Sequence, residues 1–342
     1  MNKMTIRDVN LKGKRVVMRV DFNVPMENGA VSDDTRIKAA LPTIRYLMEQ
    51  GASQVLMSHL GRPKGKGYEA EFSLKPVAEH LAGLLGKPVA FAPDALKAGE
   101  QAKNLKPGEV LLLENTRFYA EEEGKAKTDG LTDEQAAAKK KEMKLRQEVM
   151  AKTLASYGEI FVNDAFGSAH RAHASTAVIS KFFKTNVAGF LMEKEIEYLG
   201  KALSHPERPY LAILGGAKVS DKILVIEKLL TTADAILIGG AMAYAFLKAK
   251  GEEVGKSKLE TGEVDSVAVA KKTLEAAAAK KVEILLPVDH VVVKEFKADA
   301  PTLVVKTIPA DAMGVDIGPE TVKLYAAKIG RASCRERVFA VV

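Results

Sequence analysis

The sequence is poor in several residue types, and each shortage excludes a class of protein. Its 342 residues include one cysteine and no tryptophan. A single thiol excludes an intrachain disulfide framework and a cysteine-rich zinc site. No apolar run reaches the roughly 18 residues that a membrane-spanning helix needs, and residues 1–15 lack the apolar core of a signal peptide. We therefore expect a cytoplasmic protein without membrane association.

The charge is only mildly basic. Lysine and arginine number 51 against 44 acidic residues, a net charge of +7. The lysine-rich stretch AAAKKKEMKLRQEVMAK at 136–152 is most simply a solvated helix face, so we expect no nucleic-acid partner. A basic nucleic-acid binder stays an alternative, and its affinity would fall steeply as salt rises.

Short apolar runs alternate with helical patterns through residues 1–189, which predicts a parallel sheet covered on both faces. Gly51 follows the first helical pattern, where glycine favours a left-handed helix end. The predicted elements of this first domain are strands at 15–20, 54–58, 88–92, 109–114 and 159–164 and helices at 34–50, 74–86 and 132–157.

The alternation of apolar runs and helical patterns starts again after a helix-like connector, FLMEKEIEYLGKALSH, at 190–205. Further strands are predicted at 210–216, 235–240 and 282–289. The sequence therefore predicts an α/β fold with two parallel-sheet domains joined by a connecting helix, the second domain covering 206–328.

Polar side chains follow four predicted strands of the first domain. In an open parallel sheet the binding crevice lies outside the carboxyl ends of the strands, so we expect these side chains to meet. The arginine fork matches phosphate and carboxylate oxygens, which predicts a small ligand with two anionic groups; a surface ion pair remains the alternative for any single arginine. The residues are Asp21, Asn23, Ser58, His59, Arg62, Asn115, Arg117, Asn163, Asp164 and Arg171, with Arg36 added from the first helix.

The stretch GSAHRAHAST at 167–176 allows three interpretations. A zinc site on His170 and His173 needs a third ligand and a helical spacing, whereas the small residues indicate a loop, so no metal ligand is expected. An acid–base pair stays open, although no nucleophile motif accompanies it, and each histidine could simply fill loop structure. Arg171 is then the expected anion ligand, with His170 as a second donor.

The second domain has a different kind of anion site. LAILGGAKVSDK predicts a strand, a turn at Gly216 and a helix start bearing Lys218 and Lys222. Backbone N–H groups, a helix amino terminus and two ammonium groups together favour a polyphosphate. A second Gly-Gly turn at Gly240 follows the next strand, and a close helix–strand contact would explain either turn equally well.

Seven segments together resemble the phosphoglycerate kinase family, in family order. They are RVDFNVP, SHLGRPKG, LLLENTRF, VNDAFGSAHRAHAST, GGAKVSDK, GGAM and MGVDIGPET. The resemblance implies two Rossmann-like domains and reversible phosphoryl transfer between 1,3-bisphosphoglycerate and ADP, giving 3-phosphoglycerate and ATP with Mg²⁺ in glycolysis.

The resemblance also implies residue roles. The acceptor in the reverse direction is a carboxylate that is ionised at neutral pH, so no general base is needed. Arg36 and Lys218 would neutralise the transferring phosphoryl group, and closure about the connector would bring the two sites together. The resemblance assigns phosphoglycerate to Asp21, Asn23, Arg36, His59, Arg62, Arg117 and Arg171, and the nucleotide to Ala217, Lys218, Lys222, Gly240 and Gly314.

The resemblance ends near residue 328. The segment 329–342, IGRASCRERVFAVV, is similar to translated vector sequence, and we expect it to be unrelated to the family. The family's WNGPMGVFE-like and GGGDT-like segments are not found, nor is its Mg²⁺ ligand, so the second domain is expected to be incomplete. An alternative function is a fragment that only binds phosphoglycerate. We expect a monomer whose partners are 3-phosphoglycerate and an adenine nucleotide.

Overall fold

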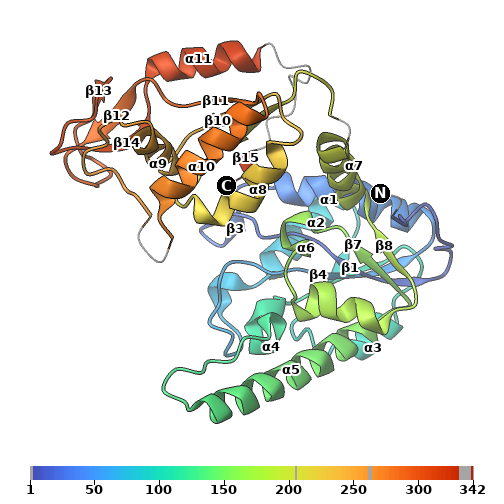
Figure 1. The fold of residues 1–342 in the computed structure, drawn as a ribbon. Helices are drawn as coiled ribbons and strands as arrows, with labels where there is room; N and C mark the ends of the chain where they lie inside the picture. Colours follow the sequence, from blue (N-terminus) through green and yellow to red (C-terminus); the bar gives the residue numbers. More distant parts are fainter. Residues whose placement is uncertain (1–2, 205, 261–263, 331–339, 342) are drawn as a thin grey trace. The chain divides into compact units, whose positions relative to one another are not determined.

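The chain forms two units, which divide between Leu199 and Gly200 (Figure 1). The computed structural model describes residues 3–204, 206–260, 264–330 and 340–341. The division falls within the connector expected at 190–205, and helix α7 (Phe190–Ser204) occupies most of that segment. Most of the expected tail, residues 331–339 and 342, lies outside the described residues.

Unit 1 contains a six-stranded sheet in the order β5-β6-β4-β1-β7-β8, with all strands parallel. Because β6, β4, β1 and β7 are neighbours, their carboxyl ends share one edge. The first five strands in chain order match predicted strands, and the last was not predicted. The strands are β1 (Arg15–Arg19), β4 (Ser53–Met57), β5 (Val89–Ala92), β6 (Val110–Leu113), β7 (Ile160–Asn163) and β8 (Asn186–Ala188).

Alternating side chains of this sheet enter two separate cores. Val16 and Met18 pack with α1 (Thr35–Glu49) and α2 (Lys75–Leu85) on one face. Val17 packs on the other face with α3 (Gly99–Lys103) and α5 (Asp133–Ala155). The predicted double covering of the first sheet is therefore confirmed.

Local signals explain where the longer helices begin and end. Thr132 caps α5, since its hydroxyl accepts from the backbone of Gln135 and that glutamine side chain accepts from Thr132. Gly51 follows α1 with a φ of 73°, as its position predicts. Shorter elements of the unit are β2 (Met26–Glu27), β3 (Ala30–Val31), η1 (Ala70–Phe72), η2 (Thr116–Phe118), α4 (Ala120–Glu123), α6 (Phe166–Ala169), the π-helix η3 (Ala174–Val178) and η4 (Ile179–Phe182).

Unit 2 contains a parallel sheet in the order β11-β10-β9-β15. Three helices pack on one face of it, and α11 packs on the other through Tyr325. The strands are β9 (Leu211–Leu214), β10 (Ala235–Ile238), β11 (Glu283–Leu285) and β15 (Ala340–Val341). The helices are α8 (Ile223–Leu229), α9 (Met242–Ala249), α10 (Ser266–Ala279) and α11 (Pro319–Ile329).

An antiparallel sheet of unit 2 was not predicted. Its order is β13-β12-β14, from β12 (His290–Val293), β13 (Leu303–Val305) and β14 (Met313–Ile317). The strand predicted over 282–289 ends at Leu285, and β12 starts a few residues later. These short β-branched runs lack intervening helices, so they pair antiparallel.

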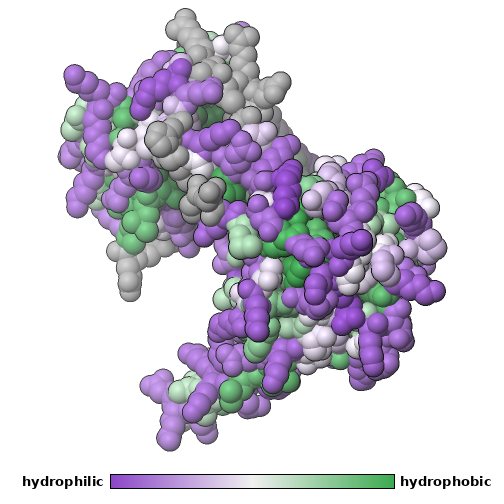
Figure 2. Space-filling model, turned by 90° about the vertical axis from the view of Figure 1, so that its right-hand side faces the viewer, coloured by the Kyte–Doolittle hydropathy of each residue, from purple (hydrophilic) through white to green (hydrophobic). Residues whose placement is uncertain are grey.

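The surface drawn in Figure 2 is mostly hydrophilic, with hydrophobic side chains in separate patches. The apolar residues of each unit are instead gathered in the cores on either side of its parallel sheet. Within the described ranges, no helix is both long and apolar enough to cross a bilayer.

Candidate functional site: two sets of anion-binding groups

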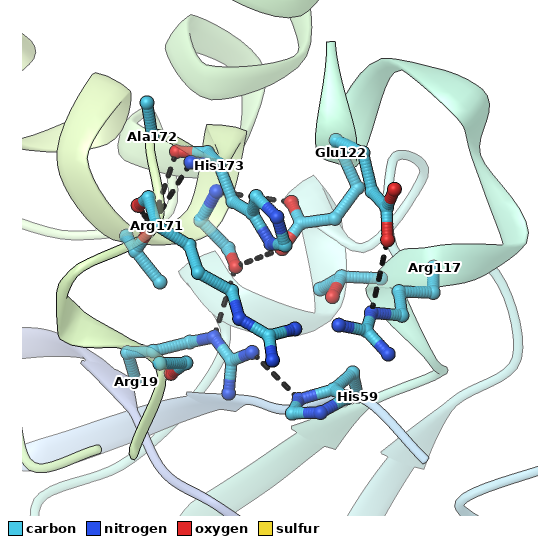
Figure 3. Close-up of polar contacts among 12 residues, drawn as sticks. Arg19, His59, Arg117, Glu122, Arg171, Ala172 and His173 are labelled. Atoms are coloured by element: carbon cyan, nitrogen blue, oxygen red, sulfur yellow. Dashed lines mark hydrogen bonds and ion pairs between the residues drawn. The ribbon is translucent and has the colours of Figure 1, made fainter. Parts of the chain in front are cut away.

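A cavity of about 1050 Å³ opens in unit 1 and is lined by loops that follow its central strands. It collects groups predicted from β1, β4, β6 and the segment after β7, which confirms that these strand ends converge. Figure 3 shows three of these side chains around a common space. The predicted residues that line this cavity are Asn23, His59, Arg62, Arg117 and Arg171.

Arg36 lines a second cavity, of about 530 Å³, together with Asn23. Its Nη1 donates to Asp21 Oδ2 over 2.7 Å. Asn23 belongs to both cavities, and its Oδ1 accepts from the Gly61 N–H at 2.8 Å. Asp21 thus orients Arg36, and Asn23 connects the two cavities.

Arg117 is a buried cation held at the floor of the larger cavity. It lies in η2, directly after β6, where Asn115 Oδ1 accepts from the Arg117 N–H at 3.0 Å. Its Nη1 donates to Gly61 O at 2.9 Å, while Nε has no hydrogen-bond partner and lies 3.7 Å from Glu123 Oε1. Burial lowers the pKa of this guanidinium, and Glu123 opposes that shift. The side chain is therefore fixed in position with donor capacity to spare.

Arg19 was missed by the sequence reasoning. It is the last residue of β1 and is 1% exposed. Its Nη2 lies 3.0 Å from His59 Nδ1, and its Nε donates to Ser175 Oγ at 2.9 Å (Figure 3). A charged residue within an apolar strand run, RVVMRV, was the available signal, because charges are buried only when they are paired.

His59 is neutral in this setting. Burial, and then the positive charge of Arg19, lowers its pKa to about 2. The imidazole therefore contributes hydrogen bonding to the cavity and no positive charge at neutral pH.

The two histidines of GSAHRAHAST lie in different places. Gly167 and Ser168 form part of the one-turn helix α6, which was not predicted, whereas His170 and His173 lie in the loop expected for them, between α6 and η3. His170 is exposed and lines neither cavity, whereas His173 is buried and lines the larger one. Among the residues that the structure covers, no group of three or more acidic, histidine or cysteine side chains could hold a metal ion.

Further lysines line the larger cavity away from its arginine floor. They come from the loop after β4, the segment after α4, and α5, and the sequence reasoning did not single them out. These residues are Lys64, Lys125, Lys127 and Lys144. Their ammonium groups add positive charge to the same space as the arginines.

In unit 2 the two Gly-Gly turns touch each other. Gly240 has a φ of +66°, and a Cβ there would lie 3.0 Å from the Gly216 backbone nitrogen. Gly216 itself has a φ of +156°, and a Cβ on it would meet the Lys222 Cε at 3.7 Å. Glycine is therefore required both by the left-handed backbone and by the close approach of the turns.

The helical segment predicted across Lys218 and Lys222 begins between these two residues, with a 3-10 turn. Lys218 lies in the turn before the 3-10 helix η5 (Ser220–Lys222), and α8 begins only afterwards. The N–H and hydroxyl of Ser220 both donate to Glu260, which anchors this extra turn. Lys218 and its neighbour Ala217 are exposed, and Lys222 is half-buried beside Gly216.

Gly314 lies in β14, where its N–H donates to Ser257 Oγ at 2.9 Å. A side chain at this position would collide with the hydroxyl of Tyr244. Tyr244 is in the first turn of α9, the helix that follows the Gly240 turn. Gly314 therefore packs against the helix that begins at one of the two glycine turns.

Together, the fold and these groups define a two-unit α/β protein with an arginine-lined cavity in one unit and glycine turns with lysines in the other. The phosphoglycerate kinase family model matches residues 6–335. The phosphoglycerate kinase of Koribacter versatilis is 50% identical over 97% of this chain and 79% of its own length. That of Moorella thermoacetica is 51% identical over 96% of this chain and 78% of its own length.

Solved structures agree with these sequence matches. Phosphoglycerate kinase from Coxiella burnetii has a TM-score of 0.74 and 38% identity, covering 97% of this chain and 78% of its own. The Pyrococcus horikoshii enzyme has a TM-score of 0.76 and 34% identity, covering 98% and 80%. The chain belongs to the phosphoglycerate kinase family.

Family membership confirms the predicted fold and activity. The protein is a phosphotransferase of glycolysis, and its family uses ATP and ADP, typically with Mg²⁺. The binding-only alternative is not favoured by these relatives. The family match extends past residue 328, where the motif resemblance ends.

Proposed function

We propose that the larger cavity of unit 1 binds 3-phosphoglycerate and that the glycine turns of unit 2 bind the phosphates of the adenine nucleotide. The proposed phosphoglycerate ligands are Asp21, Asn23, Arg36, His59, Arg62, Arg117, His170 and Arg171, with Asp21 acting through Arg36. The proposed nucleotide ligands are Gly216, Ala217, Lys218, Lys222, Gly240 and Gly314.

The observation that carries the first assignment is the buried Arg117, which lines a cavity together with Arg62 and Arg171. Three guanidinium groups around one cavity favour an anionic ligand, because their N–H groups form charge-assisted hydrogen bonds with phosphate and carboxylate oxygens. Phosphoglycerate offers a phosphate at one end and a carboxylate at the other. His170 is the weakest member of the set, since it lines neither cavity.

The second assignment rests on backbone geometry. The turns at Gly216 and Gly240 carry no side chains, so a ligand can approach their backbone closely. Lys222 lies beside one turn, and Lys218 is free to extend from it because it is exposed. Lysine is a mobile point charge suited to phosphate oxygens that move during transfer.

The chemistry follows from these assignments. In the ATP-consuming direction the nucleophile is a carboxylate, which is ionised at neutral pH and needs no base. Arg36 and Lys218 are the proposed catalytic residues, which neutralise charge on the transferring phosphoryl group. The nucleotide enters as its Mg²⁺ complex, a substrate whose ion takes mainly phosphate and water oxygens. Closure about the connector stays a prediction.

The test combines turnover with separate binding measurements. A coupled assay follows ATP consumption with 3-phosphoglycerate, and calorimetry measures each substrate alone. We expect Arg62→Ala to weaken phosphoglycerate binding at least tenfold and to leave nucleotide binding unchanged. Arg45→Ala is the matched control, because Arg45 is exposed and donates only to Leu84 O. Equal phosphoglycerate affinity in the two variants would contradict the assignment.

Two properties complete the proposal. A glycolytic enzyme works where its intermediates and nucleotides are, which supports a cytoplasmic location. A monomer is expected, and light scattering of the purified protein at micromolar concentration tests it. A mass above that of one chain would contradict this expectation.

A further inference from the structure

A buried carboxylate, Glu122, is linked to Arg19 through Ser175. Glu122 is fully buried in α4, yet it lines neither cavity. Its Oε1 accepts from Ser175 Oγ at 2.5 Å and its Oε2 from the Ser175 N–H at 3.0 Å. Ser175 Oγ in turn accepts from Arg19 Nε at 2.9 Å. A continuous chain of contacts therefore runs from Glu122 through Ser175 and Arg19 to His59 (Figure 3).

The charge of Glu122 explains how Arg19 stays buried. Burial lowers the pKa of the Arg19 guanidinium, and the positive charges of Arg117 and Arg171 act in the same direction. Glu122 opposes these effects more than Asp21 does. A buried cation among other cations needs such a partner, because an isolated buried charge is very unfavourable.

The orientation of Arg19 determines which ring nitrogen of His59 carries the proton. A guanidinium only donates hydrogen bonds, so His59 Nδ1, 3.0 Å from Arg19 Nη2, must accept. The ring is neutral, and its single proton therefore lies on Nε2. Nε2 makes no hydrogen bond within the described part of the chain, and His59 lines the cavity. The neutral ring thus keeps an unused N–H donor for an anion.

We propose that Glu122 is a positioning residue for phosphoglycerate: acting through Ser175 and Arg19, it holds His59 in the tautomer that presents Nε2–H to the bound anion. This inference rests on the proposed function of the cavity. Glu122 does not touch the substrate. It fixes a donor whose position is set before the ligand arrives, which lowers the ordering cost of binding.

The test reads the tautomer directly in the full chain. Nitrogen-15 spectra of histidine-labelled protein are expected to show His59 protonated on Nε2 and accepting on Nδ1. Glu122→Gln removes the charge with little change in volume, and Ser175→Ala breaks the chain at its next member. Both variants are expected to shift the Nδ1 signal of His59. Glu121→Gln is the matched control, because Glu121 pairs with Arg146 outside this chain of contacts.

We expect the substitution of Glu122 to change the KM for phosphoglycerate and to leave kcat nearly unchanged. In Glu122→Gln the phosphoglycerate KM is expected to rise about tenfold while kcat stays within twofold, since the His59 donor serves ground state and transition state alike. In a His59→Ala background the same substitution is expected to have no further effect on KM. If the effects of the two substitutions on KM do not add, Glu122 acts through His59, whereas general damage to the fold would raise KM in either background.

Any of three results would overturn the inference. The first is a wild-type His59 that carries its proton on Nδ1. The second is a pair of folded variants, Glu122→Gln and Ser175→Ala, whose His59 spectra and phosphoglycerate KM equal those of the wild type, and the third is a Glu122→Gln effect on KM that is just as large in the His59→Ala background. If Glu122→Gln does not fold, Ser175→Ala carries the test. Failure of the proposed function is a separate result. It would appear as unchanged phosphoglycerate affinity in Arg62→Ala, while the tautomer is still measured in the spectra.

Discussion

The two candidate sites hold their positive charges in opposite ways. In unit 1, Arg19 and Arg117 are buried and fixed by hydrogen bonds to backbone or side-chain oxygens. In unit 2, Lys218 is exposed on a turn whose shape depends on glycine. Arg19 and Arg117 are fixed before a ligand arrives, whereas the second site combines a fixed backbone with a mobile cation. The fixed arginines of unit 1 are thus suited to selecting a small acid, and the mobile lysine of unit 2 is suited to a phosphate group that moves during transfer.

Removing the buried Arg117 cation should give the largest effect. We expect Arg117→Met to weaken phosphoglycerate binding about 100-fold, because charge-assisted hydrogen bonds contribute roughly 1.5–3 kcal/mol each. Calorimetry with 3-phosphoglycerate measures this, and nucleotide affinity in the same variant should stay at the wild-type value. A loss of less than fivefold would show that the rigidity of this arginine is unrelated to the ligand.

The second largest effect expected is a loss of unfolding free energy at low pH, caused by the buried His59. His59 has a pKa of about 2 in the folded chain and 6.5 as its ordinary value. Below pH 6.5 the unfolded chain therefore binds the extra proton and the folded chain does not, so this group lowers stability as the pH falls. Between pH 7 and pH 5 the loss amounts to about 2 kcal/mol.

Urea unfolding of the wild type and of His59→Gln at both pH values checks this prediction. The variant lacks the titrating group, so its unfolding free energy should fall less across the interval. Parallel decreases in the two proteins would mean that His59 is protonated in the folded chain.

The backbone of the second site should respond to a single methyl group. Gly240→Ala places a Cβ 3.0 Å from the Gly216 nitrogen and strains a left-handed residue. We expect a loss of about 1–2 kcal/mol in unfolding free energy, with weaker nucleotide binding.

Gly251→Ala is the matched control for that strain. Gly251 also has a positive φ, of 87°, but a Cβ there meets nothing within 4 Å. Urea unfolding should therefore show the strain in both variants, and nucleotide calorimetry should show the binding defect in Gly240→Ala alone. A binding defect in both would point to a general loss of stability.

The mobile cation should give the smallest change. Lys218→Met is expected to lower kcat about tenfold, or about 1.4 kcal/mol, with little effect on stability, because the side chain is exposed. Lys228→Met, at the other end of α8, is the control. The coupled assay compares the two variants at saturating substrates, and equal kcat values would remove Lys218 from the proposed catalytic set.

Much of unit 1 could be predicted because its signals are local. Apolar runs bounded by turns identified β1, β4, β5, β6 and β7, and the rule that crevices follow strand ends placed Arg117 and His59 in one cavity. The antiparallel strands of unit 2 were missed because short β-branched runs do not reveal their partners. Their pairing depends on contacts between residues far apart in the chain.

The missed site residues share one physical reason. Glu122 lies in EEEG, which looks like ordinary polar surface in the sequence, and Ser175 lies in AHAST, where the histidine is the more evident site candidate. Their importance comes from complete burial beside Arg19, which depends on how α4 and η3 pack against each other and against α5. The 3-10 turn before α8 was not foreseen for a similar reason, since Ser220 is anchored by Glu260, forty residues later.

The order of strands in unit 1 has a consequence for folding. The cavity draws Asn23, His59, Arg117 and Arg171 from the segments after four adjacent strands, so it is complete only when the centre of the sheet has formed. A ligand that binds there therefore stabilises the entire unit against unfolding. At a concentration one hundred times its Kd that gain is about 2.7 kcal/mol. A three-carbon acid would thus protect backbone amides throughout the sheet from hydrogen exchange, including those far from the cavity.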